Sequence, residues 1–201
     1  MTYIYNEHCS VTGDEYVPIS ITSKDDILKA SRELIRQQGC SAISIRSVAN
    51  ACGVSVGSIY NYFESKADLI IATVESVWYE IFHHPEDKSV LQNTLSYINW
   101  LYQRMNYGHE QYPGFFTLHS LGFVQQDKSD GRKRMQHAWE HILNGFCFVI
   151  KSDPNVRSDA FTEQFTTEKF ADILFSLMLA ALFRQDYDPS ATLEIVRRTI
   201  Y

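Results

Sequence analysis

The pattern closest to known catalytic chemistry is a histidine pair in the second half of the chain. His137 and His141 flank Glu140 in the string HAWEH, which matches the HxxEH motif of inverted zinc proteases. Two imidazoles at i and i+4 share one helix face, so zinc ligation is geometrically possible. Catalysis would need a third ligand, and no later segment presents an obvious one. We therefore interpret the string as a solvated helix face, and we expect no metal and no cofactor.

A second set of residues has the chemistry of nucleic-acid contact. Small residues at the start of a helix let its backbone approach a groove closely, and tyrosine hydroxyls and rings can reach phosphates or thymine methyl groups. Lys66 opens the following helix, where a cation beside backbone N–H groups can hold a phosphate. The residues that we expect at such a surface are Ser55, Val56, Gly57, Ser58, Tyr60, Asn61, Tyr62 and Lys66.

Two short helices joined by a tight turn are expected to position these side chains. Ser44 can cap the first helix, Gly53 can end it, and Ser55 can cap a second helix from Val56 to about Phe63. Such a pair, with the second helix exposed, forms a helix-turn-helix unit. The apolar contacts between the two helices would come from Ile45, Val48, Ala49, Val54, Ile59 and Phe63.

The helical period of apolar residues continues along nearly the whole chain, so we predict an all-α protein of about nine helices. An upstream helix begins at Ser23, whose pairing with Asp26 resembles a capping box, and ends at Gly39. A fourth helix is expected from Ser65 towards His83, with a stop at Pro85, and a fifth through Leu91 and Met105 to an end at Gly108. A short helix is expected after Pro113, and a longer one through Met135 and Val149 to the Asp153–Pro154 turn. The last two are expected from about Ser158 to Arg184 and after Asp188 and Pro189.

Aromatic and methionine side chains are concentrated between residues 78 and 150. Core packing is the ordinary role of any single one of them. Together they are typical of an apolar pocket with a few polar groups, suited to a hydrophobic or aromatic small molecule. The expected pocket residues are Trp78, Trp100, Met105, Tyr112, Phe116, His119, Phe123, Met135, Trp139 and Phe146.

The segment from Phe170 to Phe183 is apolar on nearly all sides, with only Asp172 and Ser176 as polar interruptions. A helix of this kind must be covered on every face, either at the centre of one chain or partly by a partner. With the last helix it could form half of a four-helix interface across a twofold axis. The expected interface residues are Phe170, Ile173, Leu177, Ala181, Leu193, Val196 and Ile200.

Composition allows a packed core but gives no support to nonspecific nucleic-acid binding. The chain is 45% hydrophobic and carries a formal net charge of −6, whereas residues 22–70 hold six basic and five acidic side chains. Any contact with DNA must therefore depend on a local surface. The four cysteines show no CxxC spacing, and no signal peptide or bilayer-length apolar segment is evident. These features favour reduced thiols and a cytoplasmic location.

From Ser44 to Leu69 (SIRSVANACGVSVGSIYNYFESKADL) the sequence resembles the TetR family of bacterial transcriptional regulators. The resemblance covers about residues 23–70, and the remainder matches only in helix count and length. It implies a three-helix DNA-binding domain with a helix-turn-helix, followed by a helical ligand-binding and dimerisation domain. It also adds Ser44 and Arg46 to the residues expected at phosphates or base edges. The C-terminal domains of this family diverge widely, so the resemblance names no ligand.

These observations combine into one hypothesis with stated boundaries. Residues 1–21 form an N-terminal leader, 22–68 the DNA-binding domain, and 69–201 the ligand-binding and dimerisation domain. We expect a homodimeric repressor that binds an inverted-repeat DNA operator, is released by a small hydrophobic or aromatic effector, and has no membrane partner. The alternatives are a helical protein–protein adaptor without DNA affinity and a zinc hydrolase that uses the HxxEH string.

Overall fold

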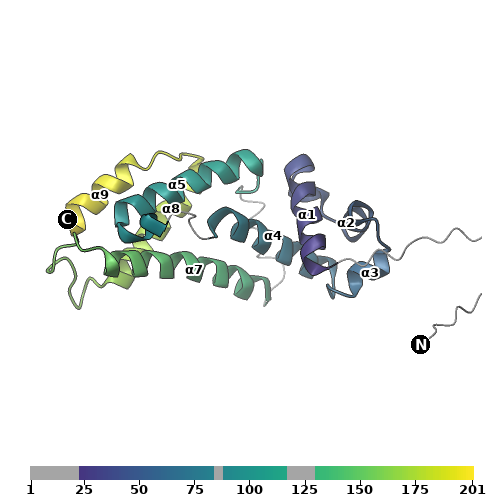
Figure 1. The fold of residues 1–201 in the computed structure, drawn as a ribbon, viewed down its shortest axis with the longest axis horizontal. Coiled ribbons are helices and arrows are strands. Elements are labelled where there is room, and N and C mark those ends of the chain that lie inside the picture. The colour runs from purple at the N-terminus through teal and green to yellow at the C-terminus, as the bar shows by residue number, and fades with distance from the viewer. Residues whose placement is uncertain (1–22, 84–87, 117–129) are drawn as a thin grey trace, which may run out of the picture.

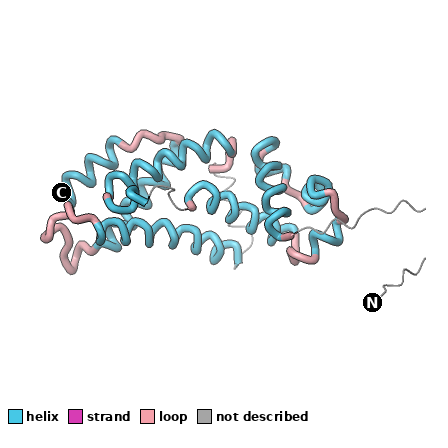
Figure 2. The backbone as a smooth tube through the Cα atoms, viewed as in Figure 1, coloured by secondary structure: helices cyan, strands magenta, loops and turns pink. Residues whose placement is uncertain are grey.

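The computed structural model describes residues 23–83, 88–116 and 130–201, except for the side chains of residues 130–138. All regular structure in these ranges is helical, which confirms the predicted fold class (Figure 2). The elements are α1 (Lys24–Gln38), η1 (Cys40–Ala42), α2 (Ile45–Cys52), α3 (Val56–Tyr60), α4 (Lys66–Phe82), η2 (Lys88–Gln92), α5 (Thr94–Gln111), α7 (Asp130–Ser152), α8 (Thr167–Arg184) and α9 (Ser190–Ile200).

Serine caps set the starts of the first four helices, as the sequence predicted. The Ser23 hydroxyl accepts a hydrogen bond from the Asp26 amide at 3.1 Å, and the Asp26 carboxylate accepts one from the Ser23 amide at 3.0 Å. This reciprocal pair is a capping box. The hydroxyls of Ser44, Ser55 and Ser65 cap α2, α3 and α4 in the same way, each accepting from the amide three residues on. Local sequence therefore fixes where the N-terminal helices begin.

Three predicted helix boundaries are wrong. Helix α3 ends at Tyr60 rather than near Phe63, although the Phe63 amide still donates to the Ile59 carbonyl at 3.1 Å. Helix α5 continues through Gly108 and ends at Gln111, and this glycine allows close packing inside the helix and does not terminate it. A Cβ at Gly108 would lie 2.8 Å from Ile81 Cδ1. Helix α8 begins at Thr167, well after the expected residue 158. The short helix expected after Pro113 and the leader at 1–21 fall largely outside the described residues.

Helices α1, α2 and α3 gather at one end of the molecule, and α5, α7, α8 and α9 form a longer bundle at the other (Figure 1). Helix α4 joins the two parts: it packs against α1 on one side and against α5 and α7 on the other. We call residues 24–60 the head and the bundle of α5, α7, α8 and α9 the body. Because α4 is a single helix, the head and the body share one rigid element.

Two close contacts stabilise the body. The buried Asp153 carboxylate follows α7 and accepts hydrogen bonds from the Thr94 amide, at 2.8 Å, and from the Tyr201 hydroxyl. It therefore ties the start of α5 and the residue after α9 to the end of α7. In the middle of α7, Gly145 faces the Tyr97 side chain, and a Cβ there would lie 2.2 Å from Tyr97 Oη. Only glycine lets these two helices approach so closely.

Candidate nucleic-acid interface and cavity

Helix α2 packs against both α1 and α3 with its apolar side. Ile45, Val48 and Ala49 of α2 are buried, as are Ile59 of α3 and Phe63 just after it. The turn between the helices uses Gly53, which has φ +66° and lies in the left-handed region that favours glycine. Helices α2 and α3 therefore form a fixed helix-turn-helix unit, and the remaining side of α3 points to solvent.

The exposed side of α3 carries the residues that the sequence singled out. Val56, Tyr60 and Tyr62 are 41%, 51% and 38% exposed, high values for apolar or aromatic side chains. Ser55, Gly57 and Asn61 are exposed as well, and Ser58 is half-buried. The Ser55 hydroxyl also caps the helix and lies 2.9 Å from that of Ser58. Helix α3 thus presents small side chains at its start and Tyr60 at its end, and Tyr62 follows in the turn after it.

Within residues 23–83, 88–116 and 130–201, no packing contact requires glycine at position 57. A Cβ there would meet only Ser55 Oγ at 3.6 Å, an ordinary van der Waals distance. No left-handed backbone angle is found at Gly57 either. A glycine that the fold does not need, on an exposed helix, is suited to the close approach of another molecule.

The remaining expected contact residues flank α3. Arg46 is exposed in the first turn of α2, and Lys66 is exposed as the first residue of α4. Ser44 is half-buried, and its hydroxyl joins a capping box with Ser47. Capping of α2 is therefore enough to explain a serine at position 44, without a DNA contact. The exposed cations Arg46 and Lys66 lie near helix N-termini, where anions bind favourably.

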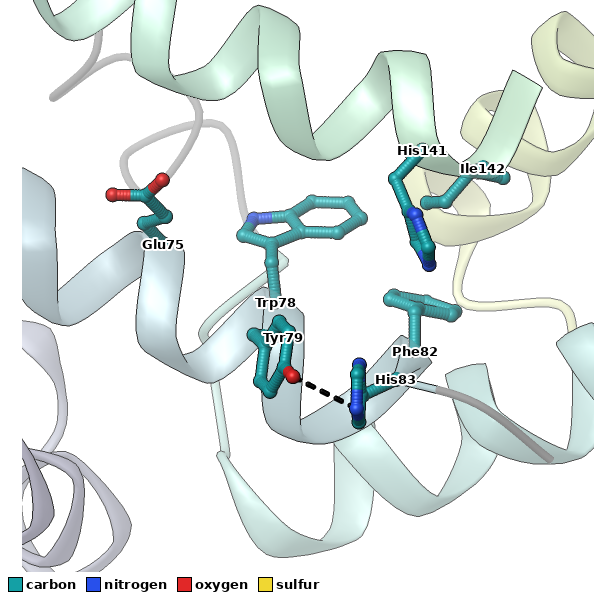
Figure 3. Close-up of a pocket in the computed structure, with 7 residues that line it drawn as sticks. All are labelled: Glu75, Trp78, Tyr79, Phe82, His83, His141 and Ile142. Carbon is teal, nitrogen blue, oxygen red and sulfur yellow. Dashed lines mark hydrogen bonds between the residues drawn. The ribbon is translucent and has the colours of Figure 1, made fainter. Parts of the chain in front are cut away.

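A cavity of about 230 Å³ lies between α4 and α7. Its α4 side is lined by residues 75, 78, 79, 82 and 83, and its α7 side by His141 and Ile142. Figure 3 shows His141 reaching from α7 toward the Phe82 ring, with the Trp78 ring beside it. The Tyr79 hydroxyl and His83 Nε2 are 2.7 Å apart, and their rings stack with centroids separated by 3.8 Å. The lining is mostly aromatic with a few polar groups.

Of the predicted pocket residues that the structure describes, only Trp78 lines this cavity. Met105, Tyr112, Phe116 and Phe146 are buried in the core, where they pack against other side chains. Trp100 stacks on Tyr97, and Trp139 packs against Phe175. His119, Phe123 and the side chain of Met135 lie outside the described residues.

The cavity residues that sequence reasoning missed had a detectable signal. Glu75, Trp78, Tyr79 and Phe82 follow the i, i+3, i+4, i+7 spacing that places side chains on one helix face. His141 of the HxxEH string also lines the cavity, whereas the side chain of His137 is outside the described part. Among the described residues, no group of three or more His, Cys, Asp or Glu side chains could hold a metal ion.

The residues expected at a dimer interface divide into two groups. Phe170, Ala181, Leu193, Val196 and Ile200 are buried within the chain. Their side chains pack within the chain's own core, so the predicted interface would have to be formed mainly by the other two residues. Ile173 is 45% exposed and Leu177 is half-buried. Two further exposed apolar side chains were not predicted: Phe183 on α8 and Ile195 on α9. No helix in the described ranges is long and apolar enough to cross a membrane.

The fold and the exposed α3 define a helix-turn-helix DNA-binding domain attached to a helical body. Comparison with known proteins agrees. Residues 27–73 match the model of the bacterial regulatory proteins of the tetR family. YerO of Bacillus subtilis (strain 168), named as an HTH-type transcriptional regulator, is 36% identical over 52 residues, or 26% of this chain and 18% of that protein. An HTH-type regulator from the lacX 3′ region of Lactococcus lactis subsp. lactis is 27% identical over 86 residues, or 40% of this chain and 44% of that protein. The matches thus span less than half of either relative.

Solved structures share the fold over nearly the whole chain. A transcriptional regulator from Rhodococcus sp. RHA1 superposes with a TM-score of 0.66 at 13% identity, over 88% of this chain and 94% of that one. The regulator FadR from Bacillus subtilis, solved in complex with stearoyl-CoA, gives 0.59 at 18% identity, over 89% and 100%. The N-terminal domain therefore matches that of the tetR-family regulators, and the described chain shares its fold with solved transcriptional regulators.

Proposed function

We propose that this protein is a homodimeric transcriptional repressor, bound to an inverted-repeat operator and released from it by a small apolar or aromatic ligand. The observation that carries the proposal is the surface of α3: exposed Val56, Tyr60 and Tyr62 beside a glycine that the fold does not require. A major groove accepts an α-helix and exposes thymine methyl groups to apolar contact. The small residues at the start of α3 allow the backbone itself to enter. A DNA regulator acts where the chromosome is, so we place the protein in the cytoplasm.

Electrostatics support a local and specific interface. The chain as a whole carries −6, while the region around the helix-turn-helix is close to neutral. Phosphate contacts would come from a few cations, with Arg46 and Lys66 exposed at the starts of α2 and α4. Nonspecific DNA affinity should therefore be weak, and base contacts should make a large share of the difference between operator and random sequence.

The cavity between α4 and α7 is the proposed effector site. Its volume of about 230 Å³ lies below the roughly 300–1,000 Å³ of sites for drug-sized ligands. A small ligand fits this space better than a long one. Trp78 and Phe82 offer flat apolar faces, and Tyr79 and His83 offer hydrogen-bonding groups. A ligand there would contact α4, the helix that begins at the head. Release from DNA requires that the ligand bind one orientation of α4 more tightly than another.

Dimerisation is proposed through the outer faces of α8 and α9. Ile173, Phe183 and Ile195 expose large apolar side chains there, and Leu177 contributes a half-buried one. Covering such side chains with the same face of a second copy would form an isologous interface. The two heads would then be related by a twofold axis, which an inverted repeat mirrors.

Selection of duplexes from a random pool by the full chain tests the proposal, with a salt titration of the selected duplex. A repressor of this design should enrich a palindrome, protect it from cleavage, and lose affinity steeply as salt rises. A chain that enriches no duplex at low salt would contradict the proposal and leave the adaptor interpretation in its place. Screening small aromatic compounds for release of the selected duplex then tests the effector site.

A further inference from the structure

A cluster of charged and aromatic side chains joins the head to the body, apart from both the DNA surface and the cavity. Glu80, near the end of α4, lies between two arginines of α1. Its Oε2 is 2.7 Å from Arg32 Nε, and its Oε1 pairs with Arg36 Nη2. These are the ion pairs in the described ranges that connect the head to the rest of the chain. They are only partly exposed, at 22–30% for the three side chains.

Tyr112 closes the cluster from the body side. It follows α5, is completely buried, and donates a hydrogen bond from its hydroxyl to Glu80 Oε1 at 2.9 Å. The Arg36 guanidinium lies 4.8 Å from the centre of its ring, close enough for a cation–π interaction. One carboxylate oxygen therefore receives donors from both the head and the body. Such charge-assisted contacts are directional, so they fix an angle as well as a distance.

The backbone under Glu80 is held independently. Arg104 of α5 donates from Nη2 to the Glu80 carbonyl at 2.9 Å and from Nε to the Ile81 carbonyl. These bonds anchor the end of α4 to the body whether or not the Glu80 side chain is engaged. The Glu80 side chain therefore contacts α1 from a backbone position that Arg104 holds in place.

From Tyr112 the contacts continue to the wall of the cavity. The Phe115 ring lies 6.0 Å from that of Tyr112 and 5.3 Å from that of Phe116, and Phe116 meets Trp78 edge to face at 5.6 Å. Trp78 lines the cavity. The aromatic side chains between the cavity and Glu80 are thus in continuous contact, and all four are buried. A displacement of the Trp78 ring would therefore be transmitted to Tyr112 through side chains that are in contact.

We infer that Glu80 and Tyr112 are positioning residues, which hold the head at one angle on the body and connect that angle to the packing of Trp78 at the cavity. This inference rests on the proposed DNA-binding function. In a dimer, a fixed head angle sets the distance and rotation between the two recognition helices. Adding one base pair between half-sites moves them apart by about 3.4 Å and rotates them by about 35°. A firmly held head should therefore reject altered spacings, and a loosened one should accept them.

The test measures spacing discrimination, which a general loss of stability would not alter. The duplex is the one that the wild-type chain selects from a random pool, prepared with its native spacing and with one base pair added or removed. Affinities come from fluorescence anisotropy of the full-length dimer, counted per folded dimer. The variants are Glu80→Gln, which keeps the shape of the side chain but removes its charge, and Tyr112→Phe, which removes only the hydroxyl.

Glu33→Gln is the matched control. Glu33 also contacts Arg36, at 3.4 Å, but lies with it on α1, so the pair does not join head to body. The control and Glu80→Gln make the same change in net charge beside the same arginine. Any purely electrostatic effect on DNA affinity should be equal in the two variants.

We expect the preference for native over altered spacing to fall about threefold or more in Glu80→Gln, because a hydrogen bond to a charged group is worth roughly tenfold or more in an equilibrium constant. Tyr112→Phe should move it in the same direction by less, and Glu33→Gln should leave it unchanged. Phe116→Leu, which alters the contact with Trp78, should also lower it.

Each other outcome overturns part of the inference. Unchanged preference in Glu80→Gln and Tyr112→Phe would show that neither residue positions the head, and Tyr112→Phe remains informative if Glu80→Gln does not fold. Unchanged preference in Phe116→Leu alone would remove the connection to the cavity. A wild-type dimer that binds all spacings equally would refute a fixed head while leaving the proposed function standing. A wild-type chain that selects no duplex would refute both.

Discussion

Replacing Gly57 by alanine should make the protein slightly more stable but weaken its binding to DNA. A residue that only supports the fold would not show these opposite effects on stability and affinity. Among the described residues, a Cβ at position 57 meets only Ser55 Oγ, at 3.6 Å, so the fold around it has room for a methyl group. Alanine also restricts the unfolded backbone more than glycine does. Together these effects should raise the free energy of unfolding by about 0.5 kcal/mol, because α3 is short. The matching shift in Tm is about 1–2 °C.

The expected loss of affinity comes from outside the fold. Gly57 lies in the first turn of α3, the part of a recognition helix that approaches the base edges. A methyl group there would hold the helix back from the groove by a fraction of its own width. Good base contacts are worth about 1–3 kcal/mol each. Weakening even one should therefore lower operator affinity by about tenfold.

Gly145→Ala is the matched comparison. Position 145 lies in α7, in the body, and a Cβ there would come within 2.2 Å of Tyr97 Oη. Tyr97 is itself held by stacking on Trp100 and by an edge contact with Phe146. Overpacking of this kind costs about 1–3 kcal/mol of stability. DNA affinity per folded dimer should be almost unchanged, because the head is not involved.

Thermal unfolding and anisotropy titration against the selected duplex measure the two effects. The reasoning predicts opposite patterns: Gly57→Ala loses affinity and keeps its stability, and Gly145→Ala loses stability and keeps its affinity. Native affinity in Gly57→Ala would refute the placement of α3 in the groove. A Gly57→Ala variant with a markedly lower Tm would instead show that the glycine serves the fold.

Three further predictions concern phosphate contact, pH and assembly. Lys66→Ala should weaken binding to all duplexes alike and make the slope of log affinity against log salt shallower by about one for each protomer, as a salt titration would show; an unchanged slope would remove Lys66 from the interface. Burial of Asp153 opposes its ionisation, but hydrogen bonds from Thr94 and Tyr201 outweigh this and hold its pKa below 3.8. The contribution of ionised Asp153 to the free energy of unfolding is therefore complete above the unfolded pKa near 3.8 and is lost as the pH falls below it. Asp153→Asn should lower the free energy of unfolding, measured in urea, by about 1–3 kcal/mol at pH 7 and by less at pH 3. An equal loss at both pH values would refute the assignment. Ile173→Glu should shift the dimer towards monomer in sedimentation at micromolar concentration, and an intact dimer would exclude that part of α8 from the interface.

Sequence reasoning performs well where structure is decided within a few residues. The serine caps of α1 to α4 and the left-handed glycine at position 53 follow from short-range hydrogen bonds and backbone angles, which neighbouring residues specify. The same reasoning misread Gly108 as a helix end. Its actual role depends on Ile81 and Phe116, and packing between helices carries no signal in the local period.

The outer face of α8 shows a second limit. A helix that is apolar on all sides must be covered, but the sequence does not say whether the cover comes from the same chain or from another. In the structure α7 packs against α8, and Phe170 and Ala181 are buried, whereas Ile173 and Phe183 are exposed. The contact between Glu80 and Arg36 is a further case, since 44 residues separate them and each is ordinary in its own helix.

The position of Glu80 has a consequence for engineering by domain exchange. A designer who cuts the chain at the expected boundary, near residue 68, would transfer α1 with both of its arginines and leave their carboxylate behind on the recipient's side of α4. The transplanted head would then lose the carboxylate that pairs with both arginines, and only Arg36 would keep a second acidic neighbour, Glu33. A functional chimera should keep Arg32, Arg36, Glu80 and Tyr112 together as one exchangeable set.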